Sequence, residues 1–102
     1  MILLYDLHGQ KVRLTDERLD HILKHSEMHG QENLISETLL TPNSVFLSHH
    51  DPTVHIYHKL FDKTPVTRKY LIVAVKYINN DAFVITSFFT NKESKGIKIW
   101  SQ

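Results

Sequence analysis

Three histidines at four-residue intervals are the side chains of this chain best placed to do chemistry. His21, His25 and His29 belong to a segment whose apolar residues recur at helical spacing. Histidine changes charge near neutral pH, so an imidazole at the protein surface can accept or donate a proton during a reaction. His25 lies on the flank of the apolar stripe and His21 projects further toward water. Both placements suit acid–base catalysis, and both also suit an ordinary surface histidine.

The same row of histidines allows a metal site as an alternative, because imidazoles four residues apart on a helix can share a zinc ion. A further ligand would have to come from Glu17, His49 or His50. The glutamate of the helical zinc-protease signature is absent, since Ile22 follows His21. The spacing therefore does not require a metal, and we predict a site without a metal or another cofactor.

A second group of reactive side chains lies on a predicted strand at 54–61. Tyrosine can stack on a base and lysine can bind a phosphate, so Tyr57 and Lys59 are candidates for contacting a nucleic acid. Strict alternation predicts that they share an exposed face with His55 and Phe61. The other face, which we interpret as the core face, carries Val54, Ile56, His58 and Leu60. A solvated strand face without a ligand is the alternative interpretation of the exposed set.

The longest regular pattern runs from 69 to 90 and predicts two long antiparallel strands closed by a turn at Asn79-Asn80-Asp81. In the first strand, Lys76 shares a face with Ala74, whose small side chain leaves space for a ligand. In the second strand, Thr86 is one of two small hydroxyl residues in an otherwise apolar run. Threonine is common in strands for structural reasons alone. Thr86 is therefore a candidate for hydrogen bonding a substrate, with a purely structural role as the alternative.

The elements that must position these residues follow from the rest of the pattern. We expect a short hairpin, or a lone edge strand, before residue 15, and amphipathic helices at 16–28 and 31–40. Thr15 is expected to cap the first helix and Pro42 to end the second. The predicted fold is α+β: two N-terminal helices packed on an antiparallel sheet of about four strands, in a single domain.

Composition limits the classes of protein and site. The chain has 102 residues and no cysteine, which excludes disulfides, thiolate metal sites and thiol nucleophiles. The opening MILLYDL is apolar but meets Asp6 early and lacks a cationic start, so we predict neither a signal peptide nor a membrane span. Together these features predict a cytoplasmic protein.

Charge is unevenly divided along the chain. Residues 1–53 carry four Lys or Arg against eight Asp or Glu, a balance of −4, whereas residues 54–102 carry eight against three, a balance of +5. A basic sheet half suits a polyanion such as RNA. Lysines that only reduce aggregation at strand edges are the alternative.

Several segments, taken in order, resemble the phage-associated branch of the barnase/EndoU/colicin/RelE-like nuclease superfamily. They are RLTDERLDHILKHSEM, SETLLTPNSV, IYHK, KYLIVAVK and FVITSF, and the resemblance runs from about Arg13 to Trp100. The resemblance implies a helical pair followed by an antiparallel sheet of four or so strands. It also implies a metal-independent endoribonuclease, with no cofactor, that cleaves by attack of the ribose 2′-hydroxyl on the neighbouring phosphodiester. Many members are toxins, either neutralised by an antitoxin or carried by larger secreted toxins.

The resemblance assigns roles to individual residues. His21 and His25 match the helix histidines of the family, and Thr86 matches the hydroxyl of its penultimate strand. Tyr57 and Lys59 match its aromatic and basic pair less strictly. Where the family often has His-Pro-Glu and Ala-Tyr, this chain has HSE at 25–27 and SFF after Thr86.

The implied reaction needs an acid, a base and cations on the phosphate. His25 would act as acid or base, Thr86 would bind a nonbridging oxygen, and Tyr57 would stack or orient. The phosphate would be held by the cations Lys59, Arg68 and Lys76. The expected partners are RNA, either tRNA or mRNA, and an acidic antitoxin that covers the basic sheet. A non-catalytic RNA-binding or protein-binding module of the same fold is the alternative.

Overall fold

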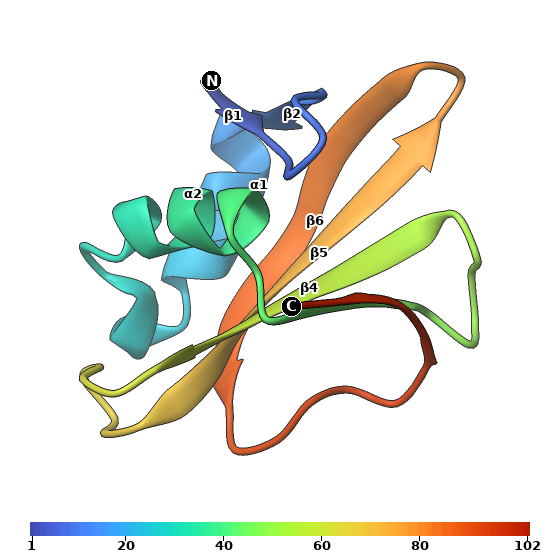
Figure 1. The fold of residues 1–102 in the computed structure, drawn as a ribbon. Helices are drawn as coiled ribbons and strands as arrows, with labels where there is room; N and C mark the ends of the chain where they lie inside the picture. Colours follow the sequence, from blue (N-terminus) through green and yellow to red (C-terminus); the bar gives the residue numbers. More distant parts are fainter.

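A computed structural model describes all residues from 1 to 102. The chain begins with a hairpin and continues with two α-helices and five further strands (Figure 1). The hairpin consists of β1 (Ile2–Tyr5) and β2 (Lys11–Leu14). The helical part consists of α1 (Asp16–Leu23), the 3-10 turn η1 (Ser26–Met28) and α2 (Glu32–Leu40). The later strands are β3 (Ser44–Leu47), β4 (Val54–Phe61), β5 (Lys69–Ile78), β6 (Asp81–Thr90) and β7 (Ile97–Ser101).

All the strands join one sheet in the order β1-β2-β6-β5-β4-β3-β7, and β2 runs parallel to β6. The prediction of two helices on an antiparallel sheet of about four strands is therefore wrong, because the sheet has seven strands and is mixed. The difference has two physical causes. The hairpin docks beside β6, where the Arg13 Nε donates to the Asp81 Oδ1 at 3.1 Å. The last segment crosses the sheet and pairs with β3 at its other side.

The first helix is shorter than predicted. Thr15 caps it as expected, since the Thr15 Oγ1 accepts a hydrogen bond from the backbone N–H of Arg18 at 3.2 Å. The helix ends at Leu23, and the chain resumes as η1. In a continuous helix Met28 would lie about 180° from Leu19, on the solvent side. The break instead places Met28 in the core, where only 1% of its surface is exposed.

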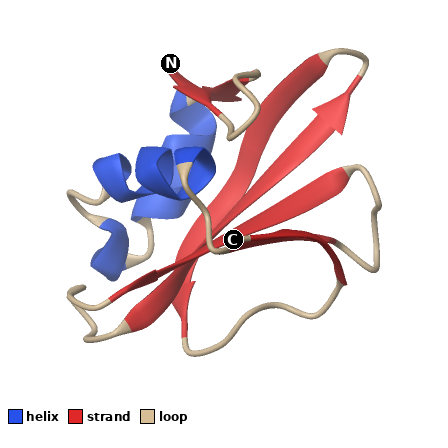
Figure 2. Ribbon diagram, in the orientation of Figure 1, coloured by secondary structure: helices blue, strands red, loops and turns tan.

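Both helices cover the same face of the sheet (Figure 2). The second helix ends at Leu40, shortly before Pro42, as predicted. It places Ile35 and Leu39 against β4 and β5, and α1 places Ile22 against β6. Neither helix has the length and apolar character that a membrane-spanning helix requires. We call this covered side of the sheet the helix face and the other side the open face.

The central hairpin forms as predicted, because its turn residues accept left-handed backbone geometry. Asn79 and Asn80 have φ angles of 50° and 65°. A β-bulge at Ile85 then changes which residues share a face: Ala74 pairs with Thr86, whereas Val75 pairs with Val84. Strict alternation would place Val84 and Thr86 on the same side. The bulge leaves Val84 in the core and turns Thr86 to the open face.

The predicted faces of β4 are also wrong. Tyr57 pairs with Val73 on the helix face, belongs to the core and is only 2% exposed. His58 points to the open face with Ile72, yet it is fully buried. The loop at 91–96 covers it, because the backbone N–H of Ser94 donates to the His58 Nε2 at 2.9 Å. Both faces of this strand are covered, so its alternation alone does not identify the core side.

Candidate functional site

Two predicted catalytic residues, His25 and Thr86, lie beside the same phenylalanine on the open face. The ring centroids of His25 and Phe88 are 6.3 Å apart, with a 42° angle between the ring planes. Phe88 pairs with Ile72 and Thr86 pairs with Ala74, so both β6 residues project from the open face. We call the surface formed by His25, Thr86 and Phe88 the β6 corner.

The position of His25 follows from the end of α1. Its backbone N–H donates to the carbonyl of Ile22 at 3.0 Å, and its carbonyl accepts from the N–H of Met28 at 2.9 Å. Ile22 and Met28 are both buried in the core. The backbone of His25 is therefore held on both sides, while its side chain remains exposed to solvent. This arrangement suits a group that must exchange protons with a substrate and with water.

Aromatic and cationic side chains extend from the β6 corner across the open face. One cross-strand row runs through the paired residues Lys98, Phe46, Ile56, Ala74 and Thr86. Lys98 Nζ lies 5.5 Å from the centre of the Phe46 ring, and the Arg13 guanidinium carbon lies 5.8 Å from the centre of the Phe83 ring. Such pairs combine a stacking surface with positive charge.

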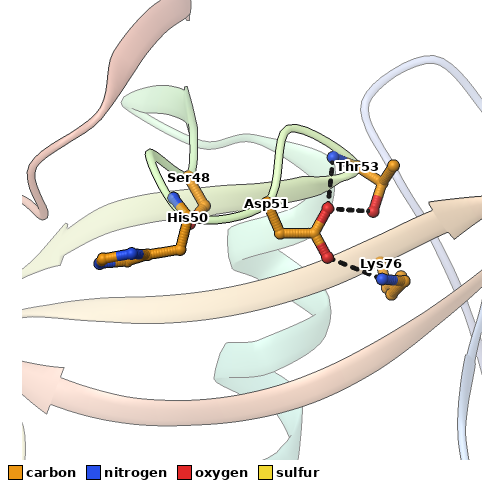
Figure 3. A network of polar contacts seen from close by, with 5 residues as sticks. All are labelled: Ser48, His50, Asp51, Thr53 and Lys76. Atoms are coloured by element: carbon orange, nitrogen blue, oxygen red, sulfur yellow. Dashed lines mark hydrogen bonds and ion pairs between the residues drawn. The ribbon is translucent and has the colours of Figure 1, made fainter.

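Lys76 also lies on the open face but is paired with a carboxylate. Its Nζ donates to the Asp51 Oδ2 at 2.7 Å (Figure 3). The other oxygen of Asp51 accepts from the backbone N–H and the hydroxyl of Thr53, whereas the His50 ring points away from this carboxylate. The hydrogen bonds from Lys76 and then Thr53 lower the pKa of Asp51 to about 2. Asp51 therefore stays charged at neutral pH and competes with any phosphate for Lys76.

The other two predicted phosphate ligands lie elsewhere. Lys59 lies on the helix face opposite Leu71, and its Nζ donates to the carbonyl of Thr41 at 2.7 Å. Arg68 lies in the β4–β5 loop, where its Nε is 3.2 Å from the Asp62 Oδ1 in an exposed ion pair. The structure thus does not bring Lys59, Arg68 and Lys76 together around one phosphate.

His21 is exposed on α1. For the alternative metal site, His21 and His25 would need a third ligand within reach. No group of three or more His, Cys, Asp or Glu side chains lies close enough together to hold a metal ion.

Tyr57, the remaining predicted residue, lines a pocket on the helix face rather than the open face. The pocket has a volume of about 470 Å³ and lies between the β1–β2 turn and the strands β3, β4, β5 and β7. Its lining residues are Asp6, Leu7, His8, Gln10, Val45, His55, Tyr57, Tyr77, Ile99 and Trp100. Sequence reasoning missed this pocket because its residues come from five separate segments and share no local motif.

A buried chain of hydrogen bonds forms one wall of this pocket. The Tyr57 and Tyr77 hydroxyl oxygens are 2.6 Å apart, and the Tyr77 hydroxyl donates to the Asp6 Oδ2 at 2.8 Å. The Asp6 Oδ1 accepts from the backbone N–H groups of His8 and Gln10, both at 2.9 Å. Asp6 is only 3% exposed. Its two carboxylate oxygens link the β1–β2 turn to Tyr77 in the sheet.

Burial sets the protonation of the aromatic residues around this chain. Desolvation raises the pKa of Tyr57 to about 12 and also raises the pKa of Tyr77. Desolvation lowers the pKa of His55, opposed by the nearby charge of Asp6. The His55 and Tyr77 ring centroids are 4.4 Å apart. At neutral pH the two tyrosines and His55 are therefore uncharged.

The chain has no match among family models, curated proteins or solved structures.

Proposed function

We propose that this protein is a metal-independent endoribonuclease that acts at the β6 corner. The observation that carries the proposal is the approach of the His25 ring to Phe88, next to Thr86 on the open face. A proton-transfer group and a hydroxyl donor from distant parts of the sequence are thus both neighbours of Phe88. The motif resemblance supplies the reaction, in which the ribose 2′-hydroxyl attacks the adjacent phosphorus and the 5′-oxygen leaves.

Each residue of the corner has a chemical role in this reaction. The exposed His25 imidazole removes the proton from the 2′-hydroxyl or delivers one to the leaving 5′-oxygen. The Thr86 hydroxyl donates to a nonbridging phosphate oxygen, where negative charge grows in the transition state. The Phe88 ring offers a surface on which a neighbouring base stacks.

Charge on the open face supports RNA as the substrate. Lys98, Lys76 and Arg13 lie on this face or at its border, with Lys76 paired to Asp51 and Arg13 to Asp81. The half of the sequence that forms most of the sheet carries a balance of +5. Tyr57 and Lys59 lie on the helix face and play no part in the proposed reaction. We further propose tRNA or mRNA as the target, a cytoplasmic location, and an acidic antitoxin that covers the open face.

The test is cleavage of total tRNA and of a long single-stranded RNA by the full chain, with and without a chelator. We expect cleavage that survives chelation and leaves 2′,3′-cyclic phosphate ends. Loss of an acid–base group should lower the rate roughly 100-fold or more in His25→Ala. His49→Ala is the matched control, because it removes another exposed histidine from a different loop and should cleave like the unaltered chain.

Two results would reject this reaction. A substrate with 2′-deoxyribose at the cleavage position must resist cutting, because the nucleophile is missing. Cleavage of that substrate, or full activity in His25→Ala, would be incompatible with the proposed mechanism.

A non-catalytic RNA-binding module is the second candidate, favoured by the cation–aromatic pairs on the open face. It predicts RNA retained in a gel shift with no product at any time. Phe46→Ala would then weaken binding, while His25→Ala would leave it unchanged. The two candidates are separated by product formation alone.

A further inference from the structure

The pocket on the helix face shares no lining residue with the β6 corner and has the features of a separate ligand-binding site. It lies on the opposite side of the sheet, and its volume of about 470 Å³ falls within the usual range for small-molecule sites, about 300–1,000 Å³. Apolar side chains from Val45, Ile99 and Leu7 line it beside a small number of polar groups. This composition is typical of a binding site.

The protons along the buried chain determine which hydrogen bonds a ligand can make. Tyr77 gives its only hydroxyl proton to Asp6, so the Tyr77 oxygen must accept the proton of Tyr57. The Tyr57 hydroxyl therefore has no proton left, and its oxygen offers only lone pairs to the pocket. A ligand that hydrogen bonds to Tyr57 must be a donor.

The charge of the pocket lining also favours a ligand that donates hydrogen bonds. The pocket contains the buried carboxylate of Asp6, and none of its lining residues is Lys or Arg. The donors to Asp6 are a hydroxyl and two backbone amides, all uncharged. An anionic ligand such as a phosphate would be repelled here, whereas a cation would gain from the uncompensated negative charge.

Aromatic rings complete the site. Tyr57, Tyr77 and Trp100 line the pocket together with His55, and tryptophan and tyrosine rings attract cations through their π faces. We propose that this pocket binds an organic cation, an ammonium or guanidinium group that donates hydrogen bonds to the Tyr57 oxygen and sits against the aromatic wall. This site is additional to the proposed nuclease site and does not depend on it.

Trp100 makes the proposal directly measurable, because it is the only tryptophan in the chain and lines the pocket. The full chain is titrated with agmatine, a free small cation that carries a guanidinium and an ammonium group, and with N-acetyl-arginine amide, which presents a guanidinium as a protein side chain does. Adenosine and AMP, at matched ionic strength, serve as neutral and anionic comparators. Tryptophan fluorescence reports occupancy.

We expect saturable fluorescence changes with a guanidinium probe and not with AMP. Saturation by agmatine alone supports a free small cation as the ligand, and saturation by both probes extends the site to an arginine of a partner. Saturation by adenosine alone would replace the cation with a neutral base and overturn the proposal. A lack of saturation with every probe would also overturn it.

Two pairs of variants locate the binding. Ile99→Lys places a positive charge at the pocket, and Ile97→Lys places the same charge on the same exposed strand outside it. The first should weaken binding at least tenfold and the second should have little effect. Tyr57→Phe removes the acceptor oxygen and should weaken binding roughly tenfold, while Tyr5→Phe alters an exposed tyrosine on β1 as its control. Equal effects within the Ile97 and Ile99 pair would reject the pocket as the site.

Discussion

The two faces of the sheet hold their reactive groups in opposite ways. On the open face, the His25 side chain is exposed and Thr86 is partly exposed, with cations and aromatic rings nearby. On the helix face, Tyr57 and Asp6 are buried and joined through Tyr77. The first arrangement suits groups that exchange protons with an RNA substrate, and the second suits a preorganised site with fixed donors and acceptors.

This difference separates stability from activity. The side chains of His25 and Thr86 at the β6 corner are exposed or partly exposed, so they can be altered at small cost to folding. Groups in the buried chain satisfy one another, so the loss of one leaves the others unpaired. Mutations at the β6 corner should therefore affect activity, and mutations in the buried chain should affect stability.

The largest effect on stability is expected for Asp6→Ala. The substitution leaves the Tyr77 hydroxyl and the amides of His8 and Gln10 without their acceptor. An unsatisfied buried group costs about 1–3 kcal/mol and a lost hydrogen bond about 0.5–1.5 kcal/mol. We therefore expect a loss of roughly 3 kcal/mol in the free energy of unfolding, measured by urea denaturation.

Asp62→Ala is the control, because it removes another aspartate that is exposed and makes only a surface ion pair with Arg68. We expect a change of less than about 0.5 kcal/mol there. Similar losses for the two aspartates would contradict the view that the Asp6 chain is a structural unit.

Low pH should destabilise the fold through two histidines, His55 on the helix face and His58 on the open face. Burial lowers the pKa of His55 on the helix face, where Asp6 opposes the shift, and lowers the pKa of His58 on the open face, where Glu93 opposes it and Lys98 adds to it. A lowered pKa means that the unfolded chain binds the proton more readily than the folded one. Their contribution is complete above the ordinary histidine pKa of about 6.5 and is lost as pH falls toward the lower folded values.

The measurement is the free energy of unfolding between pH 8 and pH 5. The contribution of these two histidines to the free energy of unfolding should be nearly constant near pH 8. The free energy should fall as the pH drops below about 6.5. His55→Gln and His58→Gln should each reduce this slope. A flat profile, or a slope that neither substitution changes, would show that the two rings do not resist protonation in the fold.

Local chemistry made several elements predictable from the sequence. The asparagines at 79 and 80 accept positive φ angles, Thr15 caps a helix, and Pro42 ends one. The four strands from β3 to β6 lie beside their neighbours in the sequence, so their pairing follows from short connections. These features depend only on residues close together in the chain.

Features set by distant contacts were not predictable. Arg13 and Asp81 are 68 positions apart, yet their contact joins the hairpin to the sheet and changes the strand count. The bulge at Ile85 depends on how β6 fits against β5. It decides the face of Thr86, and therefore whether a hydroxyl found by motif shares the open face with Phe88.

The same limit applies to the site. His25 and Thr86 were proposed from motifs, and the fold places both beside Phe88. Alternation divides a strand into two sets without showing which one the helices cover, so it predicts the wrong face for Tyr57. Asp6, Tyr77 and Trp100 meet only in the folded chain, so no spacing in the sequence could have indicated their pocket.

The smallest effect is expected at Asp51, and it tests whether the open face is restrained by its own charges. Asp51→Asn removes the negative charge paired with the Lys76 Nζ at 2.7 Å and leaves that cation available to a phosphate. Because each phosphate neutralised adds about 0.7–0.9 to the slope of log affinity against log salt, RNA binding should tighten by roughly twofold to fivefold at low salt, with a slope steeper by about one. Asp62→Asn, which frees the exposed Arg68 in the loop instead, should change the slope less. If both variants steepen the salt slope equally, RNA binding depends only on the net charge of the protein, and Lys76 has no special role on the open face.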